Sequence, residues 1–472
     1  MTVPVSTPRQ PLPDVAPAAA DPVVTAVAER LAAGDHSGAL AEAEAACARF
    51  PTIGFYALLA GTVARDAGLE DVAIRWFHRT LTLEPNQPEA LAWLAAALRR
   101  RGEPEVAERL ALRALTIRPG HAESLITLAQ ARYDLGDESG ALATLDEHAA
   151  LQGDTPAAGW VRAFALLALE RFREGWHAHE HRLVLAAGSA SAPSLRGTPW
   201  HGEPLHGRSI AVLAEQGLGD QIMMARFVHG LRRRGATRII VEAGAPLVPL
   251  LRTMPVVDAV IRRGDPFPPT DYVVPVSSLP HRLGVEGDLY VDLVPYVAAT
   301  GACPPALAAQ LATPAPLRIG LVWGGEPRNH SDHERSIPLA TFAPLLGLPG
   351  FAWYALQKGP HAAERDTLPP PLRERLVDLS GHLHDFHDTA HAMARLDVVV
   401  TVCTSVAHVA GALGVPTFVL LRHAADWRWF RGRHDSPWYP TARLFRQARR
   451  GEWAPVLRDV ARALVERLRA TR

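Results

Sequence analysis

The chain has 472 residues, of which 48% are hydrophobic and 21% are charged, a composition typical of globular proteins. Basic and acidic residues balance at 49 each, which argues against a large nucleic-acid footprint and for a local basic pocket at most. Three widely separated cysteines make no disulfide framework and favour a reducing compartment, so we expect a cytoplasmic protein. The length predicts two or three domains.

Residues 1–20 are rich in Pro and Ala and lack the apolar core of a signal peptide, so we expect a disordered lead-in. The apolar stretch Asp397–Leu421 is long enough to suggest a membrane span, but His408 and Pro416 interrupt it. We interpret it as a strand, a helix and a second strand of a buried parallel sheet, and expect no membrane span.

A fixed period of 34 residues marks the first part of the chain as a repeat array. Gly suits the turn between two helices, a small Ala allows two helices to approach closely, and Pro closes each unit. The phased positions are Gly34, Gly68, Gly102 and Gly136; Ala39, Ala73, Ala107 and Ala141; and Pro51, Pro85 and Pro119.

This pattern resembles the tetratricopeptide repeat (TPR) and predicts an α-helical TPR solenoid over residues 21–185, with a degenerate fifth unit ending near Leu183. The resemblance implies that a groove of the array binds a protein or peptide. The alternative is an array that only spaces the other domains or forms a homodimer.

Residues 186–208 are rich in Gly, Pro and Ser and predict a linker, anchored by Trp200 to the domain that follows. Strands then alternate with helix-length segments in two successive regions, 209–305 and 306–472, which we call the first and second lobes. Such alternation predicts two parallel α/β sheets, each of Rossmann-like type. In the first lobe we expect strands at Ser209–Glu215 and three later segments, and a helix over Asp220–Arg233.

Five segments in order carry a second resemblance: "EQGLGD", "IGLVWGGEPRNHSDHERSIPL", "LQKG", "VCTSVAHVAGALG" and "DSPWYPTARLFRQ". The chain is similar to bacterial proteins in which TPR repeats are fused to a GT-B glycosyltransferase of heptosyltransferase-like (glycosyltransferase family 9-like) type. The resemblance implies an inverting, metal-independent transfer from a nucleotide sugar, which is a co-substrate, with no further cofactor. The first lobe would receive the acceptor, and the second lobe would hold the donor.

The repeats imply a protein acceptor, for which flagellin is a candidate by resemblance. One alternative is a sugar transferase of the lipopolysaccharide core, although a lipid acceptor does not need a repeat array. Another is an inactive scaffold that binds only nucleotide or protein partners.

Sugar transfer needs a base to take the proton of the acceptor. Asp220 follows the first strand, where open α/β sheets bind ligands, and matches the acid that the family uses as a base. Asp220 is either that base or only the N-cap of the helix, where the helix dipole would lower its pKa. Glu215 is the second candidate base, or else a solvent-facing acid or a partner of the loop backbone. Gly217 and Gly219 would allow a tight turn and the close approach of a substrate.

The second lobe should hold the donor diphosphate. Thr404 and Ser405 are expected to begin a helix whose free N–H groups suit a phosphate, and His408 lies in its first turn. His408 either reaches the donor or packs between the lobes. Cys403 stands where related chains have Asp, and we interpret it as a buried structural thiol.

The remaining donor-side candidates are two glycines for close phosphate approach and polar or cationic side chains near strand ends. Each cation is alternatively a solvated surface charge. They are Gly324, Gly325, Arg328, Arg335, Gln357 and Lys358. Aromatic residues of the loops could stack on the base or sugar or pack the lobe interface. The His groups at 177–181 and 382–391 lack the spacing of a metal motif, so we expect no metal site.

Overall fold

The 34-residue period of the sequence corresponds to successive antiparallel helix pairs. Gly34, Gly68, Gly102 and Gly136 occupy the turns with φ between 74° and 86°, a backbone conformation that favours glycine. Ala39, Ala73, Ala107 and Ala141 are buried in the second helix of each pair. The N-terminal TPR solenoid is therefore confirmed. Its helices are α1 (Pro22–Ala32), α2 (His36–Arg49), α3 (Gly54–Asp66), α4 (Glu70–Leu83), α5 (Pro88–Arg100), α6 (Pro104–Ile117), α7 (Ala122–Leu135), α8 (Glu138–Gln152) and α9 (Pro156–Ala168).

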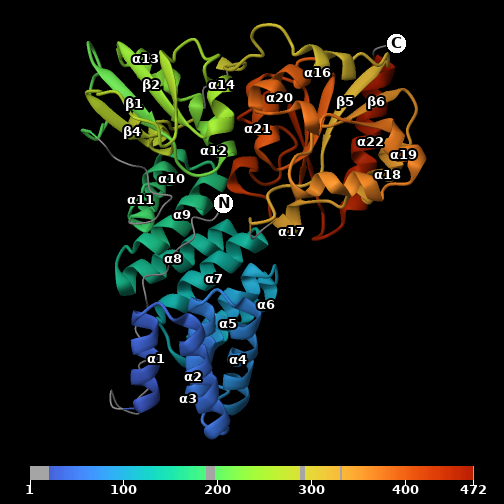
Figure 1. Ribbon diagram of the computed structural model, residues 1–472. Coiled ribbons are helices and arrows are strands. Elements are labelled where there is room, and N and C mark those ends of the chain that lie inside the picture. The colour runs from blue at the N-terminus through green and yellow to red at the C-terminus, as the bar shows by residue number, and fades with distance from the viewer. Residues whose placement is uncertain (1–20, 188–196, 288–292, 330–331, 471–472) are drawn as a thin grey trace. The chain divides into compact units, whose positions relative to one another are not determined.

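The computed structural model describes residues 21–187, 197–287, 293–329 and 332–470 (Figure 1). The expected lead-in, 1–20, lies outside the described residues. The chain divides into two compact units between Ala165 and Leu166. This boundary lies inside α9 and precedes the expected end of the array at residue 185. The helices α10 (Phe172–His179) and α11 (His181–Ala186) thus belong to the unit that contains both lobes.

The first lobe contains four parallel strands in the order β3-β2-β1-β4. Trp200 joins the preceding segment to this sheet, because its backbone N–H donates to Val273 O and its side chain is buried. The expected helix Asp220–Arg233 is instead two helices, since Nε of the buried Arg226 donates to Met223 O where the helix breaks. The elements are β1 (Ser209–Leu213), α12 (Leu218–Ala225), α13 (Val228–Arg233), β2 (Arg238–Ala243), η1 (Ala245–Leu247), α14 (Val248–Leu251), β3 (Ala259–Arg262), β4 (Tyr272–Pro275), η2 (Val276–Ser278) and α15 (Leu279–Leu283).

The second lobe contains six parallel strands in the order β10-β9-β8-β5-β6-β7. Numbered from β5, this is the doubly wound Rossmann order, with its change of direction between β5 and β8. The apolar stretch Asp397–Leu421 forms β8, α21 and β9, as expected. The strands are β5 (Leu317–Val322), β6 (Phe351–Ala355), β7 (Leu376–Asp378), β8 (Val398–Val402), β9 (Thr417–Leu421) and β10 (Ala442–Arg446). The helices are α16 (Pro305–Gln310), α17 (Asp332–Arg335), η4 (Leu339–Phe342), α18 (Ala343–Leu346), η5 (Pro360–Thr367), α19 (Pro370–Arg375), η6 (Ser380–His382), α20 (Phe386–Met393), α21 (Ser405–Ala412), η7 (Trp427–Trp429) and α22 (Trp453–Ala470).

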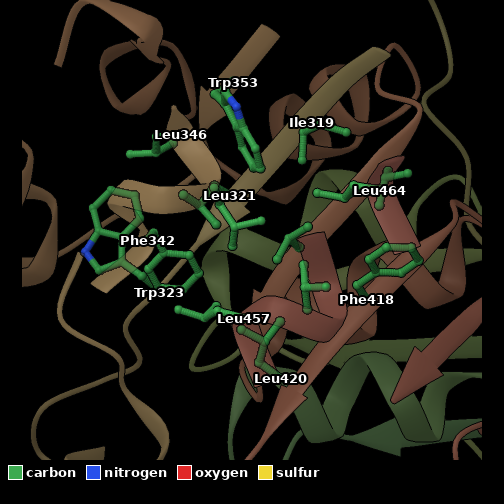
Figure 2. Packing of buried hydrophobic residues seen from close by; sticks show 14 of the residues in the cluster. Ile319, Leu321, Trp323, Phe342, Leu346, Trp353, Phe418, Leu420, Leu457 and Leu464 are labelled. Carbon is green, nitrogen blue, oxygen red and sulfur yellow. The ribbon is translucent and has the colours of Figure 1, made fainter. Parts of the chain in front are cut away.

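The C-terminal helix α22 covers one face of this second sheet. Figure 2 shows Leu457 and Leu464 of α22 in one cluster with Ile319, Leu321 and Trp353 of the central strands. Burial of side chains of this size stabilises the fold by about 1.5–3 kcal/mol each. Helix α22 thereby stabilises one face of the sheet, and the ends of the strands carry the loops of the candidate site. No helix among the described residues is long and apolar enough to cross a bilayer.

Candidate functional site

Glu215 follows β1 directly and is buried rather than solvent-facing. The Arg182 guanidinium of α11 binds it with two hydrogen bonds, Nε to Oε2 at 3.0 Å and Nη2 to Oε1 at 2.7 Å. Oε1 also accepts the N–H of Ser277, which follows β4, at 2.8 Å. Arg182 is 1% exposed and donates further to Glu180 and Ser278. Arg182 therefore fills the change of direction between β1 and β4, the place where an open sheet would otherwise receive a ligand.

Asp220 lies in the first turn of α12 but is not the N-cap. Gly217 is the N-cap residue, and Asp220 Oδ2 accepts its N–H at 3.1 Å. The other oxygen, Oδ1, lies 2.7 Å from Nη2 of Arg428 in the second lobe, and the Asp220 side chain is 9% exposed. Burial raises the pKa of Asp220, although Arg428 acts to lower it. The helix start was expected to lower this pKa, but burial has the larger effect.

Arg428 joins carboxylates of both lobes. Its Nη1 lies 2.6 Å from Oδ1 of Asp426, and its guanidinium carbon lies 4.2 Å from the centroid of the Trp427 ring. Burial acts to raise the pKa of Asp426, but Arg428 outweighs it and holds this pKa at about 2. The two carboxylates that share Arg428 thus have pKa values displaced in opposite directions.

The glycines of the first loop allow a helix, rather than a substrate, to approach. A Cβ added to Gly219 would lie 3.0 Å from Cδ2 of His408 and 3.4 Å from Cα of Ser405, both in α21. Helices α12 and α21 are therefore in direct contact through Gly219. Gly217 supplies the N-cap described above.

The start of α21 has the expected form. Thr404 is its N-cap and accepts the N–H of Val406 at 3.3 Å, and Ser405 is the first helical residue. Cys403 precedes this cap at the end of β8, and its Sγ accepts the indole N–H of Trp429 at 2.9 Å. Burial raises the pKa of the Cys403 thiol, which is consistent with a structural thiol.

His408 faces aromatic residues of the second lobe. Its Nδ1 lies 2.9 Å from the hydroxyl of Tyr439, and its ring stacks on Trp429 with centroids 5.4 Å apart. Burial, reinforced by Arg428 and Arg226, lowers the pKa of His408 to about 3. His408 is therefore neutral at physiological pH and offers a hydrogen bond, not a positive charge.

The loop after β5 is occupied by the chain's own side chains. A Cβ on Gly324 would lie 2.3 Å from the His361 ring, and one on Gly325 would lie 2.4 Å from Asp332 Oδ1. Gln357 is buried and its Oε1 accepts the N–H of Gly324 at 2.9 Å, so it fixes the loop. Arg335 donates to Asp332 at 3.0 Å and to Cys403 O at 3.1 Å, so it does lie beside the start of α21.

Arg328 and Lys358, the two other predicted cations, lie in different surroundings. Arg328 is 89% exposed and pairs with Glu326, as a surface charge would. Lys358 follows β6, and its Nζ donates to Ser380 O at 2.8 Å. Lys358 is also the only lysine of the chain, all other basic residues among the 49 Lys and Arg being arginines.

Two features of the site were missed in the sequence. Arg428 was overlooked between Trp427 and Trp429, although a cation between two aromatic rings is a recognisable signal. His361 bridges two acids, with Nδ1 2.6 Å from Glu364 and Nε2 3.2 Å from Asp332. Backbone strain also marks the site, because the non-glycine residues Gln216 and Phe430 have φ of 58° and 51°.

The paired histidines of α20 bear on the expectation that the chain holds no metal. His387 and His391 lie side by side with ring centroids 4.6 Å apart. Within the described ranges, however, no three His, Cys, Asp or Glu side chains are grouped as metal ligands would be.

Comparisons with known proteins identify the repeats and one relative. The profile of a family described as "Anaphase-promoting complex, cyclosome, subunit 3" matches residues 66–148, within the repeat array. "Protein FlbA" of Caulobacter vibrioides (strain ATCC 19089 / CIP 103742 / CB 15) is 30% identical over 364 residues. The match covers 71% of this chain and 60% of that protein, so the chain spans less than two thirds of its relative.

Solved repeat proteins are also similar to part of the chain. A crystal structure of MamA protein is 18% identical with a TM-score of 0.31, covering 36% of this chain and 92% of that one. TTC0263, a thermophilic TPR protein of Thermus thermophilus, is 21% identical with a TM-score of 0.31, covering 35% and 91%. YrrB, described as a TPR protein with an unusual peptide-binding site, is 14% identical with a TM-score of 0.30, covering 36% and 87%.

Proposed function

We propose that the α/β unit is a GT-B glycosyltransferase that transfers a sugar from a nucleotide-activated donor, with Asp220 as the base. The observation that carries this proposal is the placement of Asp220. It follows the first strand of one parallel sheet and lies in α12, which contacts α21 after β8 of the other sheet. In the second sheet, β8 lies at the change in strand order, and ligands of open α/β sheets bind at the carboxyl ends of strands near such a change.

The electrostatics of the two carboxylates support the roles given to them. Burial raises the pKa of Asp220, which brings a carboxylate closer to the value that suits a general base at neutral pH. Asp426 has a pKa of about 2 and stays anionic. Opposite shifts in neighbouring acids are typical of sites that use one of them for proton transfer.

The donor side is assigned to the start of α21 together with Arg335 and Lys358. The first N–H groups of a capped helix suit a diphosphate, as do cations. Arg335 lies beside this helix start, and Lys358 follows β6 of the same sheet. His408 contributes a neutral hydrogen-bonding group there. Arg328 has no part in this proposal, because it is a surface residue.

The repeat array would supply a protein acceptor in the cytoplasm, for which flagellin remains a candidate by resemblance. Partly exposed aromatic side chains on successive repeats, Tyr133 of α7 and Phe164 of α9, have ring centroids 6.2 Å apart and offer a surface for a peptide. A scaffold without activity is the second candidate function. The observation favouring it is that both acids considered as bases, Glu215 and Asp220, are engaged in ion pairs.

A thermal-shift screen with CMP-, UDP-, GDP-, ADP- and dTDP-linked sugars, followed by hydrolysis assays, tests the proposal. The matching donor should raise the melting temperature by mass action and be hydrolysed slowly without an acceptor. Binding without turnover, in the presence of candidate acceptors, would favour the scaffold. A complete lack of stabilisation would contradict the transferase and leave only a scaffold that binds protein partners.

A further inference from the structure

Arg428 of the second lobe forms an ion pair with Asp220, the base proposed in the first lobe. It is 4% exposed and lies within 2.7 Å of Asp220 and 2.6 Å of Asp426. While this arrangement persists, the carboxylate of Asp220 is turned to Arg428 and Gly217 and is nearly closed to solvent. A protein acceptor could not place its nucleophile against the carboxylate of Asp220 unless this arrangement changed.

The guanidinium of Arg428 is already occupied by two carboxylates in the same arrangement. Two carboxylates share one guanidinium, and the neighbouring His408 is neutral. A diphosphate entering beside α21 would therefore have to displace a carboxylate in order to bind Arg428. A guanidinium binds phosphate oxygens with the same paired geometry that it uses for carboxylates.

The backbone beside Arg428 is suited to a second conformation. Phe430, two residues later, has φ 51° and ψ −170°, which is strained for a side-chain-bearing residue. The carbonyl oxygens of Trp429 and Phe430 are held by Nη2 of Arg446, at 2.9 Å and 2.7 Å. Strained backbone at a ligand site is a common element of a conformational exchange.

We propose that Arg428 is a positioning residue that exchanges its ion pair with Asp220 for an ion pair with the donor diphosphate, so that donor binding releases the carboxylate of Asp220. The identity of the anion rests on the proposed function. The exchange makes the donor bind before the acceptor, because the carboxylate becomes accessible only when Arg428 has left it. By linkage, a change at Asp220 that weakens its pair with Arg428 and leaves the guanidinium intact should strengthen diphosphate binding.

The test is calorimetric titration of inorganic pyrophosphate into the full chain and three variants. Asp220→Asn removes the competing charge, so pyrophosphate should bind tighter by on the order of tenfold. Arg428→Gln should weaken binding on the order of tenfold, and Arg428→Lys should fall between it and the native chain, since Lys keeps the charge but not the fork. The matched control is the exposed pair Asp459–Arg462 in α22, 3.3 Å apart, for which Asp459→Asn and Arg462→Gln should leave affinity unchanged.

The exchange predicts affinity changes of opposite sign in Asp220→Asn and Arg428→Gln, and a purely structural role of Arg428 does not. If Arg428 only held the lobes together, both Asp220→Asn and Arg428→Gln would weaken binding, and that result, or unchanged affinity in Asp220→Asn, overturns the proposal. If circular dichroism shows that Arg428→Gln does not fold, the pyrophosphate affinities of Asp220→Asn and Arg428→Lys still test the exchange. Turnover of nucleotide sugars is measured separately. Tighter pyrophosphate binding without turnover contradicts the proposed function alone, whereas turnover without tighter binding contradicts the exchange alone.

Discussion

The guanidinium of Arg428 lies 2.7 Å from the carboxylate of Asp220, and the two residues come from different lobes. Both side chains are nearly closed to solvent. Removing one partner of a buried ion pair leaves the other charge without compensation and costs about 3–5 kcal/mol. The second carboxylate, Asp426, reduces that cost because it keeps contact with Arg428. Any variant of Asp220 therefore changes stability as well as chemistry.

If Asp220 is the proposed base, replacing it by Asn should lower turnover by about 10²–10⁴-fold, the usual contribution of a general base. The Asn side chain can still accept the N–H of Gly217, so the start of α12 should be retained. Asp426→Asn is the control, because it also removes one carboxylate from Arg428 but not the base. Single-turnover rates and melting temperatures are to be measured on the same samples. Equal losses in both variants would show that Asp220 acts only through its ion pair.

Glu215→Gln should lower the free energy of unfolding by about 3–5 kcal/mol, since Arg182 would remain buried without its main partner. Turnover of the folded fraction should change little. Urea unfolding measures the first quantity. The control is Glu174→Gln, which breaks an exposed pair with Arg171 and should cost about 0–1 kcal/mol. A stable Glu215→Gln protein without turnover would instead point to Glu215 as the base.

His361→Gln should be more destabilising at pH 6 than at pH 9. Burial acts to lower the pKa of His361, but its hydrogen bonds to Glu364 and Asp332 outweigh burial and raise it. A raised folded-state pKa stabilises the fold below the unfolded value of about 6.5, and this stabilisation is lost as pH rises through the folded pKa. Chemical unfolding of both proteins at several pH values measures the difference. A difference in unfolding free energy that is constant with pH contradicts the charged pair.

Lys358 provides a direct probe of the proposed donor site, because it is the only lysine side chain of the chain. An amine-reactive reagent should modify Lys358 and the N-terminal amine, and mass spectrometry distinguishes them. With nucleotide at about 100 times its dissociation constant, labelling of Lys358 should slow by on the order of tenfold or more. Lys358→Arg is the control, since it keeps the charge and removes the label. If a nucleotide raises the melting temperature but does not slow the labelling of Lys358, the donor does not bind beside β6.

Deleting residues 21–155 should abolish modification of a protein acceptor while nucleotide binding and cooperative unfolding persist. Deleting 21–183 should also destabilise the lobes, because it removes Arg182 from Glu215 and Trp176 from its contact with Trp427, where ring centroids lie 5.4 Å apart. Differential scanning calorimetry compares the two truncations. Equal stability of both would show that α10 and α11 are dispensable for the lobes.

The repeats and most strands were predictable because their signals are local. A period of 34 residues and runs of buried β-branched residues, such as those of β8, identify their elements without tertiary information. The strand β10 was missed. Its sequence, Ala-Arg-Leu-Phe-Arg, lies at the edge of the sheet, and Arg443 and Arg446 leave only two consecutive buried apolar residues, too few for an apolar run.

The candidate site was predictable only in outline. Motifs located the loops, including Asp220 and the cap Thr404, since strand ends and caps are encoded within a few residues. The partners of these side chains come from distant segments. Arg182 precedes Glu215 by 33 positions, and nothing local to either residue encodes that pairing. The glycines likewise indicated a close approach without indicating that α21, rather than a substrate, is what approaches Gly219.

Arg182 and Trp176 have a consequence for how such a chain can evolve. They lie in the helices that follow the last regular repeat, yet their partners, Glu215 and Trp427, belong to the two lobes. A recombination event that joined a foreign repeat array to these lobes would therefore preserve the α/β unit only if it fell before Leu166. The number of upstream repeats can drift by duplication or loss, whereas α10 and α11 must be inherited with the lobes, and substitutions at 182 and 215 should covary.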